Sequence, residues 1–314
     1  MPKKVIIDCD MGTDDAVALC ISLFDSSLDI VALTATEGCV TADQSNNNLQ
    51  AIVGELDPTR YPRLGMAESA DNAPPINTSY LYGKDGLGNA GFEVSKLQHL
   101  HSSEKLIIDC VRDNPGDVTI VCLGPLTNLA RAFRRDPALP AMIDRVVING
   151  GTLSGCGNIT PAAEFNFYFD PESAREVLKS RTTKTLIPLD VTQQVTFGFD
   201  VMDELPEENT RTGCFLRQIL PFAFRAYRQQ LGCEGITLND AVGMLALMEP
   251  DLFQFEKLGC DVETSGELTR GATIFDRRVV PEWRPNLEVA VGINVEGARQ
   301  QILDQLVMAG NVTR

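Results

Sequence analysis

Short apolar runs alternate with longer amphipathic segments along the first two thirds of the chain. Apolar runs of about four to eight residues are typical of buried strands, and longer segments with a period near 3.6 residues are typical of helices. The sequence predicts strands at residues 5–10, 30–36, 118–123, 145–149, 185–188 and 287–294, and a strand pair around Gly266 to Gly271. It predicts helices at residues 14–24, 42–55, 103–114, 125–135, 171–180, 214–231, 240–248 and 295–308.

This alternation predicts the α/β class, with a single domain over residues 1–314. We expect a Rossmann-like, open, mostly parallel sheet with helices on both faces. In such sheets ligands bind beyond the carboxyl ends of the strands. Polar or glycine-rich residues follow four predicted strands, at positions 8–10, 37–39, 123–125 and 149–151. We expect these strand ends to converge on one crevice, covered by the long connections 68–92 and 150–169.

Four aspartates lie where the first predicted strand ends and the first helix begins. They are Asp8, Asp10, Asp14 and Asp15. Buried carboxylates repel one another unless a cation or a shared proton compensates their charge. The apolar segments on both sides argue against full solvation of this cluster. Because the ligands would all be oxygen atoms, the sequence predicts a hard ion such as calcium or magnesium.

The composition narrows the classes of partner. A net charge of -16 argues against nucleic acid, because phosphate contacts need clustered Lys and Arg. No apolar run approaches the roughly 18 residues of a membrane span, and the N-terminus runs into a strand without a signal-peptide pattern. We therefore expect a cytoplasmic protein that binds a small molecule or a metal, and neither nucleic acid nor membrane.

The cysteines and histidines exclude other kinds of site. Nine cysteines are scattered without any Cys-x-x-Cys spacing, which predicts reduced core residues such as Cys20, Cys110 and Cys122. His99 and His101 are the only histidines, so a zinc site built on several imidazoles is excluded. We expect these two to lie on a solvated surface helix rather than on a strand.

Five motifs occur in order along the chain. They are residues 8–16 (DCDMGTDDA), 83–88 (GKDGLG), 124–128 (GPLTN), 157–166 (GNITPAAEFN) and 170–172 (DPE). Any one of them is weak evidence, but together they resemble the inosine-uridine preferring nucleoside hydrolase family, over nearly the whole chain. The resemblance implies hydrolysis of the N-ribosidic bond of a ribonucleoside or related riboside, giving ribose and free base. It also implies a calcium ion, a role in purine or pyrimidine salvage, and a homodimer or homotetramer.

On the matching positions, the resemblance implies that calcium is bound by Asp10, Asp15, Asp240 and the backbone carbonyl of Leu123. Sugar hydroxyls and a water would complete the six to eight oxygen ligands that calcium commonly takes. The metal lowers the pKa of that water, and Asp10 accepts its proton as general base.

The same resemblance implies that Asp14 binds the ribose 2′ and 3′ hydroxyls, and that Asn158, Glu164 and Asn166 hold the 3′ and 5′ side. Positive charge develops on the ribose as the bond breaks, and nearby carboxylates stabilise it. Each residue also has a structural alternative. Asp14 and Asp240 begin predicted helices and could cap them. Asn158 and Asn166 could be turn residues, and Glu164 a surface carboxylate.

At the positions expected near the leaving base, the sequence departs from the family pattern. Asn239 stands where many members have a His that protonates the leaving base, and others a Trp. Tyr82 replaces a second His, Cys39 the usual Asn, and Asn149 a frequent Met. An amide cannot transfer a proton at neutral pH, whereas Tyr82 could stack on the base, donate its phenol, or simply pack. We therefore expect Tyr82, Asn149 and Asn239 at the substrate, with a leaving group other than inosine's or uridine's, or slow turnover of common nucleosides.

Two other functions compete. A haloacid-dehalogenase-like phosphohydrolase would use Asp8 as nucleophile and Asp10 as acid/base with magnesium. That family has Thr or Val where this chain has Gly12, and a phosphohydrolase function would leave Asp14 and Asp15 without a role. The second alternative is a non-catalytic riboside-binding protein, which would keep the calcium and sugar contacts without activating the leaving group.

Overall fold

A computed structural model describes residues 2–71, 73–94, 101–154 and 156–313. Within these ranges one nine-stranded sheet has the order β10-β13-β7-β6-β5-β1-β2-β3-β4. Its strands are β1 (Lys3–Cys9), β2 (Leu28–Ala35), β3 (Arg63–Met66), β4 (His101–Ser102), β5 (Val118–Cys122), β6 (Arg145–Asn149), β7 (Lys184–Ile187), β10 (Phe253–Leu258) and β13 (Leu287–Ile293). All neighbouring pairs are parallel except β10 with β13 at one edge. The predicted α/β class and mostly parallel sheet are confirmed.

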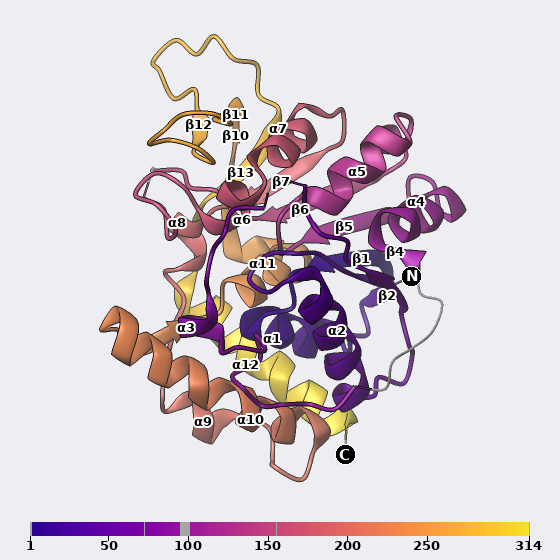
Figure 1. Cartoon of the computed structure of the whole chain (residues 1–314), viewed down its shortest axis with the longest axis vertical. Coiled ribbons are helices and arrows are strands. Elements are labelled where there is room, and N and C mark those ends of the chain that lie inside the picture. Colours follow the sequence, from indigo (N-terminus) through magenta and orange to yellow (C-terminus); the bar gives the residue numbers. More distant parts are fainter. Residues whose placement is uncertain (1, 72, 95–100, 155, 314) are drawn as a thin grey trace.

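Helices cover both faces of the sheet (Figure 1). One face carries α1 (Thr13–Ser22), α2 (Ala42–Leu56), α10 (Arg211–Ala226), α11 (Asn239–Met248) and α12 (Val295–Val312). The other carries α4 (Ser103–Asp113), α5 (Thr127–Arg135) and α7 (Pro171–Lys179). The alternation of β1 explains the two layers: Val5 and Ile7 pack with the first group of helices, and Ile6 with the second. Both faces of a central parallel strand are buried, so its sequence reads as one apolar run.

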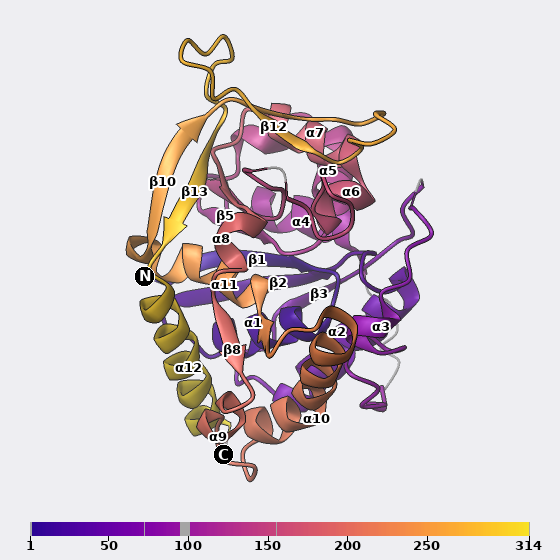
Figure 2. The same ribbon diagram turned by 90° about the vertical axis from the view of Figure 1, so that its left-hand side faces the viewer.

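Shorter elements connect these layers. They are α3 (Ser79–Tyr82), α6 (Phe165–Phe169), α8 (Leu189–Thr192), α9 (Val201–Glu204), a π-helical turn at Tyr227–Leu231, and 3-10 turns at Leu139–Ala141 and Pro250–Leu252. Two small antiparallel pairs join β8 (Thr196–Gly198) with β9 (Gly235–Thr237), and β11 (Cys260–Val262) with β12 (Thr273–Phe275). The second pair, at the top of Figure 2, is the predicted one, with Gly266 to Gly271 in its connecting turn. No helix in the described ranges is long and apolar enough to cross a membrane.

Sequence analysis missed three strands of the large sheet: β4 and β10 at its two edges, and β3 beside β4. Strands β3 and β4 span only four and two residues, too few for a period to be visible. His101 lies on β4, so its predicted place on a surface helix was wrong; His99 lies outside the described residues. All nine cysteines are free, and the three predicted core cysteines are buried.

The chain order of the strands fixes where a ligand can bind. From β1 the chain adds β2, β3 and β4 on one side, and then returns to place β5 on the other side of β1. A crevice forms at such a reversal, beyond the carboxyl ends of the two strands. Asp10 follows β1 and Leu123 follows β5, so both lie at this reversal.

Candidate functional site

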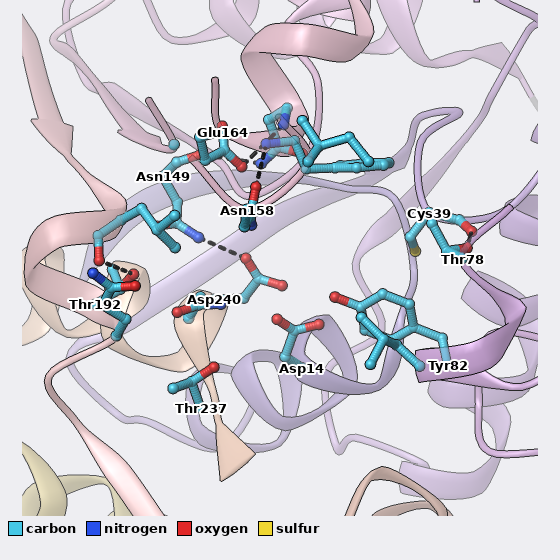
Figure 3. A pocket seen from close by; sticks show the side chains of 18 of the residues that line it. Asp14, Cys39, Thr78, Tyr82, Asn149, Asn158, Glu164, Thr192, Thr237 and Asp240 are labelled. Atoms are coloured by element: carbon cyan, nitrogen blue, oxygen red, sulfur yellow. Dashed lines mark hydrogen bonds between the residues drawn. The ribbon is translucent and has the colours of Figure 1, made fainter. Parts of the chain in front are cut away.

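A cavity of about 360 Å³ lies at this end of the sheet (Figure 3). Its lining includes almost all the predicted site residues: Asp10, Asp14, Tyr82, Leu123, Asn149, Asn158, Glu164, Asn166, Asn239 and Asp240. The exception is Asp15, which is fully buried behind the cavity wall. The connections 68–92 and 150–169 both contribute lining residues, as the sequence predicts for loops that cover a site.

The start of α1 presents two of the carboxylates. Gly12 is the N-cap, and its N–H donates to Oδ2 of Asp15 at 2.8 Å. Carboxylates in the first turn also interact favourably with the helix dipole. The cap interaction therefore belongs to Asp15, while Asp14 faces the cavity (Figure 3).

The turn after β2 packs tightly on Asp10. The N–H of Cys39 donates to Oδ2 of Asp10 at 2.7 Å. A Cβ atom on Gly38 would lie 2.2 Å from the same oxygen, so any side chain there would displace the carboxylate. This close approach requires glycine and fixes the orientation of Asp10.

Four aspartates of the site form two pairs, Asp10 with Asp15 and Asp14 with Asp240, each within hydrogen-bonding reach. One oxygen each of Asp14, Asp15 and Asp240 lie within 4.8 Å of one another. Burial raises the pKa of all four carboxyls, that of Asp14 to about 6, and repulsion between them adds to this for Asp14, Asp15 and Asp240. A divalent cation would offset this repulsion.

Oδ1 of Asp15 is the clearest sign that the cluster fits a cation. It is buried and has no hydrogen-bond partner among the described residues. A buried oxygen of this kind is costly unless a proton or a cation satisfies it. Hard, oxygen-rich donor sets of this kind suit calcium or magnesium.

Asp240 reaches the cluster from α11. Asn149, at the end of β6, donates from Nδ2 to Oδ1 of Asp240 at 2.7 Å. The N-cap of α11 is Leu238, so Asp240 does not occupy the capping position that was its structural alternative. Asn149 thus orients a carboxylate of the site, in addition to lining the cavity.

Asp8 has a different role from its neighbours. Its Oδ1 accepts from Thr34 Oγ1 at 2.6 Å and from Asn128 Nδ2 at 2.8 Å, and burial raises its pKa to about 7. It is fully buried and joins β1 to β2 and α5 instead of facing the cavity. A nucleophile must reach its substrate, so this placement argues against the phosphohydrolase alternative.

Glu164 is buried, so its structural alternative as a surface carboxylate was wrong. It caps α6, because its Oε1 accepts from the Asn166 N–H at 2.9 Å and its Oε2 from the Phe167 N–H at 3.2 Å. Oε2 also accepts from the Gly151 N–H at 2.9 Å. Burial raises its pKa to about 7 although these donors favour the charged form. Sequence analysis had not anticipated this capping role.

Asn166 and Asn158 stabilise the backbone around the cavity. Nδ2 of Asn166 donates to the Leu123 carbonyl at 2.7 Å and to the Asn149 carbonyl at 3.2 Å. The Leu123 carbonyl has a second lone pair that a cation can use. Oδ1 of Asn158 accepts from the Phe165 N–H at 2.8 Å. Asn158 therefore has the turn role considered for it, whereas Asn166 lies within α6, and both side chains also line the cavity.

Aromatic and hydroxyl-bearing side chains line one end of the cavity, which we call the aromatic end. Tyr82 lies at the end of α3 and lines the cavity. The negative charge of Asp14 raises the pKa of the Tyr82 phenol well above its usual value. Tyr227 shares a hydrogen bond of 3.0 Å with Thr237, and burial raises its pKa to about 12. Both phenols therefore keep their protons at neutral pH. Oδ1 of Asn239 is buried here without a partner in the described part of the chain.

Sequence reasoning missed Tyr227 and Thr237, because neither belongs to a motif. The motif at residues 83–88 is structural. Asn48 donates to the carbonyls of Asp85 at 2.7 Å and Met11 at 2.9 Å, and Thr13 donates to that of Gly86 at 3.2 Å. These bonds tie the segment after α3 to the start of α1, which positions Tyr82 over Asp14.

Comparison with known proteins agrees with this geometry. Residues 5–300 match the family described as inosine-uridine preferring nucleoside hydrolase. The pyrimidine-specific ribonucleoside hydrolase RihA of Citrobacter koseri is 32% identical, over 98% of both chains. The solved plant nucleoside hydrolase PpNRh1 superposes with a TM-score of 0.91 at 29% identity, covering 98% of this chain and 99% of that one. The purine-preferring ribonucleoside hydrolase from Gardnerella vaginalis has a TM-score of 0.89 at 26% identity, covering 99% and 100%.

Proposed function

Because the chain belongs to the inosine-uridine preferring nucleoside hydrolase family, we propose that it is a calcium-dependent enzyme acting on the N-ribosidic bond of a ribonucleoside or related riboside. The products would be ribose and the free base. One observation carries the calcium proposal: the buried, unpartnered oxygen of Asp15 within a cluster of carboxyl groups beside the cavity. Such a donor set requires a cation or protons.

The proposed ligands are Asp10, Asp15, Asp240 and the carbonyl of Leu123. When bound, calcium would supply coordination of the ribose hydroxyls and acidification of the attacking water. Asp10 accepts the proton of that water, and the Cys39 N–H holds its carboxylate in place for this transfer.

The remaining sugar contacts are proposed for residues on the cavity wall. Asp14 binds the 2′ and 3′ hydroxyls, and Asn158, Glu164 and Asn166 bind the 3′ and 5′ side. As the bond to nitrogen breaks, positive charge develops on the ribose. The carboxylates that face the cavity then stabilise this charge.

The leaving group departs into the aromatic end. Tyr82, Asn239, Tyr227 and Thr237 can hydrogen-bond to a base there, but no histidine lies among the described residues that line the cavity. The relatives compared above include pyrimidine-specific and purine-preferring hydrolases, so both classes of base belong in the assay. We expect slow turnover of inosine and uridine, because a phenol gives up its proton less readily than an imidazolium.

The test is a panel of purine, pyrimidine and non-nucleobase ribosides, with free ribose measured with and without a calcium chelator. The expected result is ribose release that the chelator abolishes and calcium restores. Asp10→Asn is expected to lower kcat at least about 100-fold, the contribution typical of a general base. Absence of ribose from every riboside would refute the hydrolase proposal, and full activity of Asp10→Asn would refute the role of Asp10.

A riboside-binding protein without useful turnover is the second candidate. The observation that favours it is Asn239, whose amide cannot protonate a leaving base. Calorimetric binding of ribose or a nucleoside, without hydrolysis over hours, would identify it. The nine-stranded sheet, whose described strands come from both ends of the chain, supports one domain over residues 1–314. A homodimer or homotetramer, a salvage role and a cytoplasmic location stay predictions.

A further inference from the structure

Cys39 is held firmly against the aspartate cluster. Its N–H donates to Oδ2 of Asp10 at 2.7 Å, its Sγ donates to the Asp10 carbonyl at 3.4 Å, and its carbonyl accepts from Thr78 Oγ1. The residue is 8% exposed and lines the cavity, with its sulfur drawn on the inner side in Figure 3. A Cβ atom on Gly12 would lie 2.9 Å from that sulfur, so the thiol sits directly against the start of α1.

The sulfur belongs to a second group of potential metal ligands. Sγ of Cys39 and one carboxylate oxygen each of Asp10 and Asp15 lie within 4.8 Å of one another. Oδ1 of Asp15 is fully buried and has no hydrogen-bond partner in the described part of the chain, which is a separate sign that this residue needs a cation. Asp15 also belongs to the oxygen-only group with Asp14 and Asp240, so the two groups share one ligand residue.

Sulfur makes the two groups chemically different. Calcium takes oxygen ligands, whereas thiolates favour zinc and softer ions. Zinc bonds of about 2.0 to 2.3 Å place tetrahedral ligand atoms roughly 3.5 Å apart. The three ligand atoms lie within 4.8 Å of one another, so they would draw closer together on such an ion. A group of one sulfur and two oxygens with an open side toward the cavity is suitable for this class of ion.

We propose that Cys39, with Asp10 and Asp15, binds a thiophilic divalent cation of the zinc and cadmium class in competition with calcium. The thiol proton passes to solvent as the metal–sulfur bond forms. Because Asp10 and Asp15 are also proposed calcium ligands, the two ions exclude each other. The inference rests on the proposed cation site and adds a ligand and a class of metal to it. Zinc bound in this way displaces the proposed calcium ion, and therefore inhibits the enzyme.

Cadmium tests this without an activity assay, because cadmium–thiolate bonds absorb in the ultraviolet. The full-length protein is stripped with a chelator and titrated with Cd²⁺, alone and with excess Ca²⁺. The variants are Cys39→Ser and Cys39→Asn, the second keeping the residue usual in the family. Cys260→Ser is the matched control, since Cys260 is 6% exposed and lies on β11. Circular dichroism checks that each variant is folded.

We expect wild type and Cys260→Ser to show a cadmium–thiolate absorption that calcium suppresses and that both Cys39 variants lack. Cadmium affinity should fall at least about 10-fold in these variants, since even loss of an outer partner of a metal ligand costs that much. Equal absorption in wild type and a folded Cys39 variant, or no suppression by calcium, would overturn the inference. If calorimetry detects no calcium binding in wild type, the proposed calcium site fails instead. If calcium binds but no Cys39-dependent absorption appears, only the cysteine inference fails.

Discussion

Replacing Asp15 by Asn is expected to stabilise the cation-free protein and to abolish its stabilisation by calcium. Oδ2 of Asp15 accepts the Gly12 N–H at 2.8 Å, and an Asn oxygen can keep this bond. The Asn amide nitrogen then replaces the unpartnered Oδ1 and can donate to Asp10. A repulsive carboxyl pair becomes a hydrogen-bonded pair, but a divalent ion loses one anionic ligand.

Both effects can be expressed as temperatures. Calcium at about 100 times its Kd stabilises the folded state by about 2.7 kcal/mol. An unfolding entropy of about 2.1 cal/mol/K per residue gives roughly 0.66 kcal/mol/K for this chain, so Tm should rise by about 4 °C. Two unit charges about 4 Å apart repel by about 4 kcal/mol at an effective dielectric constant of 20. Partial protonation relieves some of this, so Asp15→Asn should raise the cation-free Tm by at most about 6 °C.

The assay is scanning calorimetry of wild type and Asp15→Asn, each with a chelator and with saturating calcium. Asp8→Asn is the matched control, because Asp8 is equally buried but faces Thr34 and Asn128. We expect Asp8→Asn to keep the increase in Tm produced by calcium. The reasoning is refuted if calcium leaves the wild-type Tm unchanged, or if Asp15→Asn retains the full increase.

Three further predictions concern other parts of the site. Gly38→Ala should lower kcat about 100-fold, because its Cβ would lie 2.2 Å from Asp10 Oδ2. Gly54→Ala, in open space on α2, should leave kcat unchanged, and equal kcat values for the two variants would contradict this prediction. Asn239→His should raise kcat on inosine or uridine about 100-fold by supplying a proton donor, and Asn239→Gln should not; an unimproved His variant would show that leaving-group protonation does not limit turnover. Burial raises the pKa of Glu164 to about 7, so its contribution to stability is full below pH 4.5 and is lost as the pH rises through 7. Relative to Glu164→Gln, wild type should therefore lose about 3 kcal/mol of stability between about pH 4.5 and pH 8, measured from Tm with a chelator present; a pH-independent difference would contradict it.

Much of the fold could be predicted from local patterns. The apolar run of β1 and the period of α1 lie within single segments, so the alternation of strands and helices is visible in the sequence. The edge strand β10 was missed: Phe253, Gln254 and Phe255 alternate, but β10 pairs antiparallel with β13 across a distant connection. Pairing of this kind depends on which edge of the sheet is free, which no local window records.

The residues of the site likewise fall into those that the sequence identifies and those that it does not. The motif residues that bind the ribose in the proposed mechanism, such as Asp14 and Glu164, could be identified from the sequence and do line the cavity. Tyr227 and Thr237 could not, because the first lies on a π-helical turn after α10 and the second on β9, in segments without a motif. Their hydrogen bond at the base end of the cavity exists only once the two segments pack together.

The sequence by itself determined that several carboxylates crowd at the end of a buried strand and must be compensated. That follows from four aspartates within eight residues of sequence, which no fold can place far apart. Only the tertiary structure decided how they pair, Asp15 with Asp10 and Asp14 with Asp240, and that Asp8 turns away from the cavity. The physical reason is that these contacts depend on the strand order around β1 and on the packing of α11 against α1, which bring distant residues within hydrogen-bonding reach.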